Sequence, residues 1–255
     1  MPNAALLNKY NIPVPRYTSY PAVPHWKNGM DAEKWKDAFI KQFHKSNSTE
    51  GISLYLHLPF CESLCTYCGC NKKITTNHNV EEEYISVILK EWQMYRALMN
   101  EVPVIREIHL GGGTPTFFSP QNLGRLANDL LKRSLVHPDA NFSLEGHPNN
   151  TTKEHLEILS ESGFRRISYG VQDNDPKVQK AINRIQPLEN LRNATEMARN
   201  AGYQSINFDL IYGLPFQTPE SVRRTILECV ALKPDRIAYY SYAHVHWTSR
   251  GQRLF

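Results

Sequence analysis

Residues 52–70 read ISLYLHLPFCESLCTYCGC, and this stretch decides the fold. The run at 52–59 is apolar and rich in β-formers, and it leads straight into the pattern Cys61-x3-Cys65-x2-Cys68. The cysteines therefore stand on the loop that follows the first predicted strand.

Five further β-rich runs follow, at 105–110, 142–145, 166–171, 205–212 and 236–242. Helix-type segments separate them, and this alternation predicts parallel strands with right-handed crossovers. Both an open doubly wound sheet and a partial or full α/β barrel fit the pattern. Either fold gathers the carboxyl ends of its strands on one rim, so we expect the cysteines, the loop at 111–114, Glu145, Gln172 and Asp209 to converge there.

Helix starts are marked by capping residues. Asn79 with Glu82 and Thr151 with Glu154 have capping-box spacing. Three more predicted N-caps each precede a proline; they are Ser119, Asp175 and Thr218. In contrast to these alternating strands and helices, the sequence of residues 1–50 predicts an irregular lead segment that contains one short helix.

Bulk composition excludes several classes of protein. The 255 residues carry a formal net charge of +4, which is too small and too scattered for a nucleic-acid binder. No apolar run is long enough to cross a membrane, and the first ten residues do not resemble a signal peptide. We expect a cytoplasmic monomer.

Cysteine usage indicates metal chemistry. Four of the five cysteines lie within ten residues, and the fifth, Cys229, sits in an apolar helical pattern that predicts burial. Three thiolates on one loop can hold three irons of a [4Fe–4S] cube and leave the fourth iron without a protein ligand. Zinc is the alternative, with Cys70, His57 or His78 as the fourth ligand.

Beyond this spacing the chain resembles a known family. The cysteine loop, with Tyr67 before its third cysteine, is similar to the cluster loop of radical S-adenosylmethionine (SAM) enzymes. The Gly-Gly-Gly-Thr-Pro run at 111–115 resembles their motif for the amino group of SAM. Further segments resemble, in order, those of oxygen-independent coproporphyrinogen III oxidase; they lie at 15–21, 53–60, 68–72, 170–173, 183–184, 209–219 and 242–244.

The resemblance implies a partial radical-SAM-type (β/α)6 barrel of parallel strands at 51–255, after the lead segment at 1–50. It implies that two propionates of coproporphyrinogen III are decarboxylated to vinyl groups without O2, which gives protoporphyrinogen IX in haem biosynthesis. A [4Fe–4S] cluster and SAM, in two copies, are the implied cofactors, and a flavodoxin or ferredoxin is an implied electron donor. The family continues into a final barrel helix and a helical C-terminal domain, so this chain would be a truncated barrel.

The resemblance also implies site residues. Cys61, Cys65 and Cys68 would ligate the cluster. The first SAM would contact Tyr55, Gly112, Gly113, Thr114 and Glu145. The second SAM would contact Tyr67, Gln172, Arg184, Asp209 and Ala243. Candidate catalytic residues are Cys70, His57 and Tyr242, and Cys70 is not expected to bind iron.

Other interpretations stay open. The chain could have another radical SAM activity or handle haem, or it could be a zinc-binding protein without catalysis. Single residues could also be structural: Glu145 as a helix cap, Asp209 as a locally paired carboxylate, Arg184 as a surface residue, and Cys70 and His57 as packed side chains.

The lead segment and the departures from the family pattern give further expectations. Arg16, Tyr17 and Tyr20 could meet the carboxylates of the substrate, or could only pack. Gly146 is expected to loosen the end of its strand, and His147 replaces a carboxylate. A further departure is His246, where the family commonly has proline.

Overall fold

The computed structural model describes residues 4–10, 12, 21–22, 25–27, 29, 31–245 and 250–254. The chain forms two compact units, Met1–Gln42 and Phe43–Phe255. Helix α1 (Ala4–Tyr10) belongs to the first unit, and α2 (Ala32–Ser46) begins in it. The predictions for Arg16, Tyr17, Tyr20 and His246 fall outside the described residues.

The second unit is built on six parallel strands: β1 (Ile52–Leu58), β4 (Val104–Gly112), β5 (Leu135–Gly146), β6 (Phe164–Gln172), β7 (Ser205–Tyr212) and β8 (Arg236–Ser241). Their order in the sheet follows the chain without a reversal. A doubly wound sheet reverses its strand order, so the partial barrel is confirmed. All six predicted strands are present.

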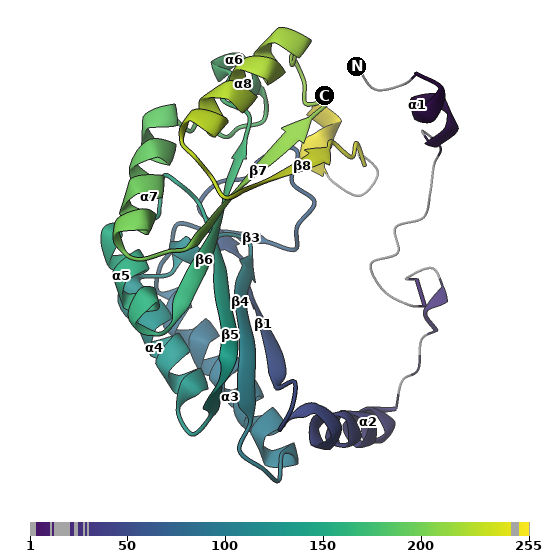
Figure 1. The fold of residues 1–255 in the computed structure, drawn as a ribbon, viewed down its shortest axis with the longest axis vertical. Helices are drawn as coiled ribbons and strands as arrows, with labels where there is room; N and C mark the ends of the chain where they lie inside the picture. Colours follow the sequence, from purple (N-terminus) through teal and green to yellow (C-terminus); the bar gives the residue numbers. More distant parts are fainter. Residues whose placement is uncertain are drawn as a thin grey trace. The chain divides into compact units, whose positions relative to one another are not determined.

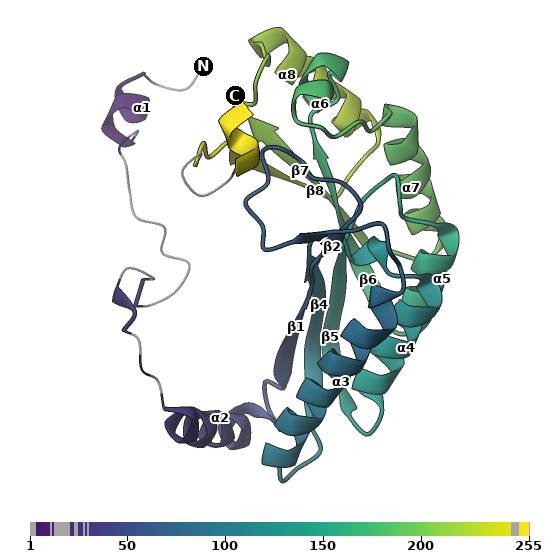
Figure 2. The same ribbon diagram turned by 180° about the vertical axis from the view of Figure 1, so that it is seen from behind.

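The helices cover one face of this sheet, as Figures 1 and 2 show. They are α3 (Val80–Leu98), α4 (Pro120–Leu131), α5 (Lys153–Glu161), α6 (Pro176–Ala181), α7 (Leu188–Asn200) and α8 (Pro219–Ala231). Two 3₁₀ helices, η2 (Pro115–Phe117) and η3 (Arg250–Leu254), and one short parallel pair, β2 (Phe60–Cys61) with β3 (Lys73–Ile74), complete the described elements. No described helix is both long and apolar enough to cross a bilayer.

Three predicted N-caps are confirmed. The side chains of Ser119, Asp175 and Thr218 accept hydrogen bonds from backbone N–H groups in the first turns of α4, α6 and α8, at 3.3, 2.9 and 3.1 Å. A proline follows each of them at the first helical position, where its missing N–H costs nothing. These caps fix where the chain turns from the rim of the sheet into each helix.

Two predicted capping boxes are wrong. Asn79 has helical backbone angles, and its side chain caps nothing. Glu82 instead contacts Arg125 on α4 at 2.6 Å. The cap of α5 is Thr152 rather than Thr151, and His155 completes its capping box.

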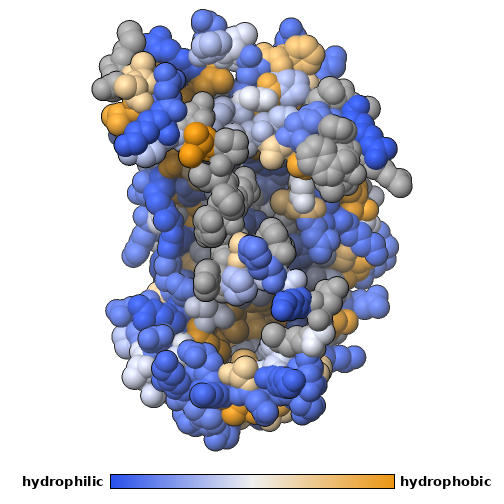
Figure 3. Space-filling view, turned by 90° about the vertical axis from the view of Figure 1, so that its right-hand side faces the viewer, coloured by the Kyte–Doolittle hydropathy of each residue, from blue (hydrophilic) through white to orange (hydrophobic). Residues whose placement is uncertain are grey.

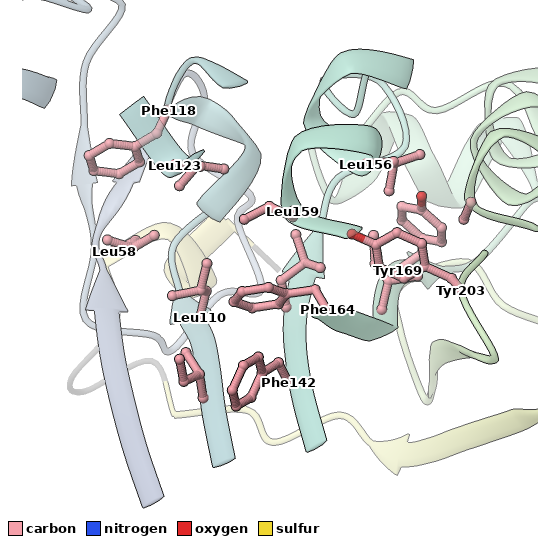
Figure 4. Close-up of a cluster of buried hydrophobic side chains, with 14 of the residues drawn as sticks. Leu58, Leu110, Phe118, Leu123, Phe142, Leu156, Leu159, Phe164, Tyr169 and Tyr203 are labelled. Atoms are coloured by element: carbon pink, nitrogen blue, oxygen red, sulfur yellow. The ribbon is translucent and has the colours of Figure 1, made fainter. Parts of the chain in front are cut away.

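The core lies between the sheet and the helices (Figure 4). Alternate strand residues such as Leu58, Leu110 and Phe142 are buried on this side. Tyr169 is fully buried and donates a hydrogen bond from its hydroxyl to the carbonyl of Ala194 at 3.1 Å. Cys229 is also buried there, as predicted.

The opposite face of the sheet, which we call the inner face, is polar. Because successive side chains alternate, the residues between the buried ones point away from the helices. The inner face carries Ser53, Tyr55, His57, Glu107, His109, Ser143, Glu145, Arg166, Ser168, Asn207, Asp209, Arg236 and Tyr240. Figure 3 shows the molecule turned by 90° from Figure 1, and most of its coloured residues are hydrophilic.

Candidate active site

The cysteine loop is closed by the β2–β3 pair. The N–H of Lys73 donates to the carbonyl of Pro59 at 2.8 Å, and the N–H of Thr75 donates to the carbonyl of Cys61 at 2.9 Å. Within the loop, the ammonium of Lys72 donates to the carbonyls of Cys68 and Cys70, at 3.1 and 3.2 Å. These bonds fold the segment back over the rim of the sheet.

One cavity of about 320 Å³ lies under this loop at the carboxyl ends of the strands. The predicted site residues on its wall are Cys61, Cys65, Tyr67, Cys68, Cys70, Gly112, Gly113, Thr114, Glu145, Gln172, Arg184 and Asp209. The convergence expected from the topology is therefore confirmed. Tyr55, His57, Tyr242 and Ala243 do not line the cavity.

The thiols can be tested for the metal they fit. A single zinc ion bonds sulfur at about 2.3 Å, so its ligands crowd together. In the described part of the chain, no three His, Cys, Asp or Glu side chains are gathered in that way. In a [4Fe–4S] cluster each cysteine binds a separate iron, so the thiols lie farther apart than around one zinc ion. Three thiols on one cavity wall match that arrangement.

Three of the thiols in the loop have shifted pKa values. A hydrogen bond with Cys70 lowers the pKa of Cys68 to about 6, and the same contact raises the pKa of Cys70. Burial raises the pKa of Cys61, although a hydrogen bond with Thr114 at 3.3 Å opposes this. Metals bind thiolates, and the lowered pKa of Cys68 favours that form.

The glycine loop packs against the start of the cysteine loop. The N–H groups of Gly113 and Thr114 donate to the carbonyls of Leu58 and Phe60 at 2.9 and 3.0 Å. A Cβ on Gly113 would lie 2.5 Å from the carbonyl oxygen of Pro59, so no other residue fits without moving the backbone.

Glu145 at the end of β5 holds the same loop from below. One of its oxygens accepts a hydrogen bond from the N–H of Gly112 at 3.1 Å, and the other lies 3.4 Å from Nε2 of His109. Nδ1 of His109 in turn lies 2.8 Å from the hydroxyl of Ser143. Glu145 therefore does not cap a helix, and it presents a carboxylate to the cavity.

Tyr55 and His57 form a small network beside the glycine loop. The backbone carbonyl of Asn71 accepts from Nε2 of His57 at 2.8 Å, which leaves Nδ1 to accept from the hydroxyl of Tyr55 at 3.0 Å. A Cβ on Gly112 would lie 2.9 Å from the His57 ring. His57 thus ties the first strand to the cysteine loop and the glycine loop.

The far wall of the cavity carries Arg184. Its guanidinium donates to the carbonyl of Gly170 at 2.6 Å and lies 3.7 Å from the sulfur of Cys65. Its Nε is buried and has no hydrogen-bond partner in the described part of the chain. An unpartnered cationic donor in a cavity is suited to a carboxylate.

Asp209 completes this wall from β7. Its oxygens accept from the hydroxyl of Ser168 at 2.7 Å and from the amide of Asn207 at 2.9 Å. Burial raises the pKa of Asp209, and these two hydrogen bonds oppose the rise.

The expectation for Gly146 is wrong. Gly146 stays in register with Tyr169, and its missing side chain lets β5 pack tightly, because a Cβ would lie 3.0 Å from the Tyr169 ring. His147 lines this cavity and a neighbouring one of about 640 Å³. Burial, with the charge of Arg184, lowers the pKa of His147 to about 3, so this ring is neutral.

Tyr242 and Ala243 follow β8. Tyr242 and Tyr67 both pack against a small apolar cluster of Val178, Ile182 and Leu214. Residues that the sequence reasoning missed in and around the cavity are Lys72, His109, Ser168, Asn207 and Tyr240. Strand alternation was the signal that could have found four of them, since they share the inner face with Glu145 and Asp209.

Comparison with known proteins gives the family. The radical SAM superfamily matches residues 55–229, and its members imply a [4Fe–4S] cluster and SAM as cofactors. Proteins called oxygen-independent coproporphyrinogen III oxidase are similar in sequence: that of Helicobacter pylori is 42% identical over 96% of this chain, and that of Pseudomonas aeruginosa is 40% identical over 95%.

The chain spans about half the length of these relatives, 54% and 53%. Among solved structures, that of coproporphyrinogen III oxidase HemN from Escherichia coli, described as a radical SAM enzyme, superposes with a TM-score of 0.87. It is 34% identical and matches 99% of this chain but 55% of the other. With its parallel partial barrel and a cysteine loop facing a glycine loop across one cavity, this chain belongs to the radical SAM superfamily.

Proposed function

We propose that this chain carries the radical SAM barrel of an oxygen-independent coproporphyrinogen III oxidase. The observation that carries the proposal is the identity of 40–42% to proteins of that name over nearly the whole chain. The proposed reaction converts two propionates of coproporphyrinogen III to vinyl groups and gives protoporphyrinogen IX in haem biosynthesis.

The cofactor residues proposed from the sequence have suitable surroundings. Cys61, Cys65 and Cys68 would hold the cluster. Gly112, Gly113 and Thr114 would hold SAM, with Tyr55 and Glu145, and the carboxylate of Glu145 suits an ammonium group. When bound, the cluster and SAM would together supply a 5′-deoxyadenosyl radical that takes a hydrogen from the propionate β-carbon.

A second SAM is proposed on the opposite wall. Arg184 would bind its carboxylate through the free Nε, and Asp209 would accept its hydroxyl or ammonium hydrogens. Tyr67, Gln172 and Ala243 complete this proposed group. Tyr67 lines the cavity from the cysteine loop, and the amide of Gln252 donates to its backbone carbonyl at 2.8 Å.

The catalytic residues stay proposals. Cys70 is exposed at the cavity mouth, where it could meet the substrate. His57 has both ring nitrogens engaged, which favours a role in holding the reactants over proton transfer. Tyr242 packs against the same apolar cluster as Tyr67, which belongs to the proposed second SAM group.

The remaining proposals concern the surroundings of the enzyme. A low-potential donor such as a flavodoxin or ferredoxin would reduce the cluster. We propose a cytoplasmic monomer with no nucleic-acid or membrane partner, in which a lead segment at 1–50 precedes the barrel at 51–255.

Anaerobic purification and assay test the function. The chain should be brown and hold about four irons. With coproporphyrinogen III, SAM and dithionite, mass spectrometry should find a product that has lost two CO2 and four hydrogens, the change from two propionates to two vinyl groups. Cleavage of SAM without loss of CO2 would contradict the proposed substrate, and a colourless chain with one zinc would contradict the radical chemistry.

A further inference from the structure

The inner face of the sheet carries two arginines below the cavity. Arg166 on β6 has the same side-chain direction as Ser168, and Arg236 on β8 has the same direction as Tyr240. Ser168 and Tyr240 both line the cavity. Because side chains two apart on a strand point the same way, both arginines face the space directly beneath it.

Neither arginine is neutralised. No ion pair joins Arg166 or Arg236 to any carboxylate among the residues that the structure describes, whose ion pairs lie elsewhere. Arg165, one residue away on the opposite face, shows the contrast, because its guanidinium donates to the carbonyl of Ser160 at 2.6 Å and to that serine's hydroxyl at 2.9 Å.

The residues beside the two arginines are small or neutral. Arg166 pairs with Ser143 on β5 and with Ser205 on β7, and Arg236 pairs with Asn207. The acids on the same face are Glu107, Glu145 and Asp209. Glu107 accepts a hydrogen bond from Ser53, and the other two belong to the cavity.

The two arginines are far enough apart to hold separate groups. They stand two strands apart across β7, and their partners on β7 are two residues apart along it. With strands about 4.8 Å apart and a rise of about 3.3 Å per residue, the two Cα atoms lie roughly 12 Å apart. The cavity's own cations serve other groups, since Arg184 donates to the carbonyl of Gly170 and is proposed to bind SAM, and Lys72 donates to the backbone of its loop.

We infer that Arg166 and Arg236 bind two carboxylates of the substrate, those remote from the propionate at the reacting centre. The inference rests on the proposed function, whose substrate carries four carboxylates on one flexible macrocycle. Each guanidinium can hold a carboxylate through two parallel hydrogen bonds. The two arginines would orient the macrocycle beneath the cavity so that one propionate at a time reaches it.

Binding of coproporphyrin III, the stable oxidised form of the substrate, tests the inference. The full chain is titrated anaerobically, and porphyrin fluorescence gives the dissociation constant without cluster reduction or turnover. Arg166→Gln and Arg236→Gln should each weaken binding about tenfold, because each removes a charge-assisted pair. The double variant should bind coproporphyrin about fiftyfold more weakly or worse, and this difference in affinity should be smaller in high salt.

Arg165→Gln is the matched control, and it should change the affinity less than twofold. Circular dichroism and the urea midpoint show that each variant is folded. If the unaltered chain binds coproporphyrin and the double variant binds it equally well, the inference is wrong while the proposed function stands. If the unaltered chain does not bind coproporphyrin, the proposed function is wrong, and the inference falls with it.

Discussion

Asp173 offers a strong test of how the fold holds the cavity, because it is 1% exposed and joins its own loop to the loop before α8 and to α8 itself. Its Oδ1 accepts from the N–H of Asp175 at 2.7 Å and from the hydroxyl of Thr225 at 3.1 Å. Its Oδ2 accepts from the amide of Gln217 at 2.5 Å, and Gln217 also donates to the carbonyl of Ile211 at 2.8 Å. Asp173 directly follows Gln172, and its loop leads into α6 and on to Arg184.

Asp173→Asn keeps the shape and turns one acceptor into a donor. The new amide must face either the Gln217 amide or the two donors at Oδ1, so at least one buried donor loses its partner. Each such loss costs about 1–3 kcal/mol, and the remaining bonds lose their charge assistance. We expect the free energy of unfolding to fall by about 3 kcal/mol, a large part of the 5–15 kcal/mol of a typical domain.

A double-mutant cycle with Gln217→Glu tests the pairing itself. Gln217→Glu alone places two carboxylates in contact and should destabilise the chain, whereas the two changes together restore one donor facing one acceptor. The double variant should be at least about 1 kcal/mol more stable than the sum of the single effects predicts. Urea denaturation followed by circular dichroism measures all four proteins. An Asp173→Asn midpoint equal to the parent's, or additive effects, would refute this reasoning.

Four further predictions concern the cavity and one helix cap. Replacing any one of Cys61, Cys65 and Cys68 by Ala should abolish iron retention, and Cys70→Ala should keep about four irons per chain by chemical iron analysis; loss of iron from the Cys70 variant alone would disprove the ligand assignment. Gly113→Ala should cost about 1–3 kcal/mol in denaturation and weaken SAM binding in calorimetry, because its Cβ meets the backbone at 2.5 Å, and the control Gly69→Ala, with open space around its Cβ, should change neither. Burial lowers the pKa of His155, so the stability that its neutral ring contributes is present above the unfolded pKa of about 6.5 and is lost as the pH falls below it. His155→Gln should reduce that loss by up to about 1.4 kcal/mol per pH unit between pH 7.5 and 5.5. Identical profiles of stability against pH for the two proteins would contradict this. Gln172→Gly should weaken SAM binding without lowering the free energy of unfolding measured in urea. A fall of more than about 1 kcal/mol in that free energy would show that the Gln172 side chain stabilises the fold.

The sequence predicts the strands and the rim well, since two-residue alternation and parallel order leave few choices. It predicts β5 poorly. The expected run at 142–145 is observed as Leu135–Gly146, because 135–136 pair with β4 and the ladder then breaks before Asn141. Pro138 and Asp139 lie in that break and interrupt the alternating pattern, so the local sequence predicts a loop, whereas the pairing of 135–136 with β4 extends the strand.

Helix caps fail for a related reason. Glu82 has the spacing of a capping box, but Arg125 on another helix engages it. Thr151 has a capping side chain, but its hydroxyl donates to the carbonyl of His147 at 2.9 Å, and the cap moves to Thr152. Arg125 is 43 residues from Glu82 in the sequence, and His147 lies outside the predicted helix, so spacing alone cannot show which of two hydrogen-bond partners a side chain chooses.

Gln172 shows both what the pattern contains and what it omits. Alternation places it on the inner face with Ser168 and Gly170, yet the ladder shifts after Gly170, and Gln172 pairs with Leu210, whose side chain is buried toward the helices. A regular strand residue opposite Leu210 would point the same way. The backbone of Gln172 is instead left-handed, with φ of 68°, and its side chain lines the cavity. That conformation costs a non-glycine residue about 1–2 kcal/mol. The polar anchor beside it, Asp173, is held by hydrogen bonds from three other positions and can sustain the strain. The sequence therefore predicts that Gln172 belongs to the site, and the long-range contacts of Asp173 determine the direction of the Gln172 side chain.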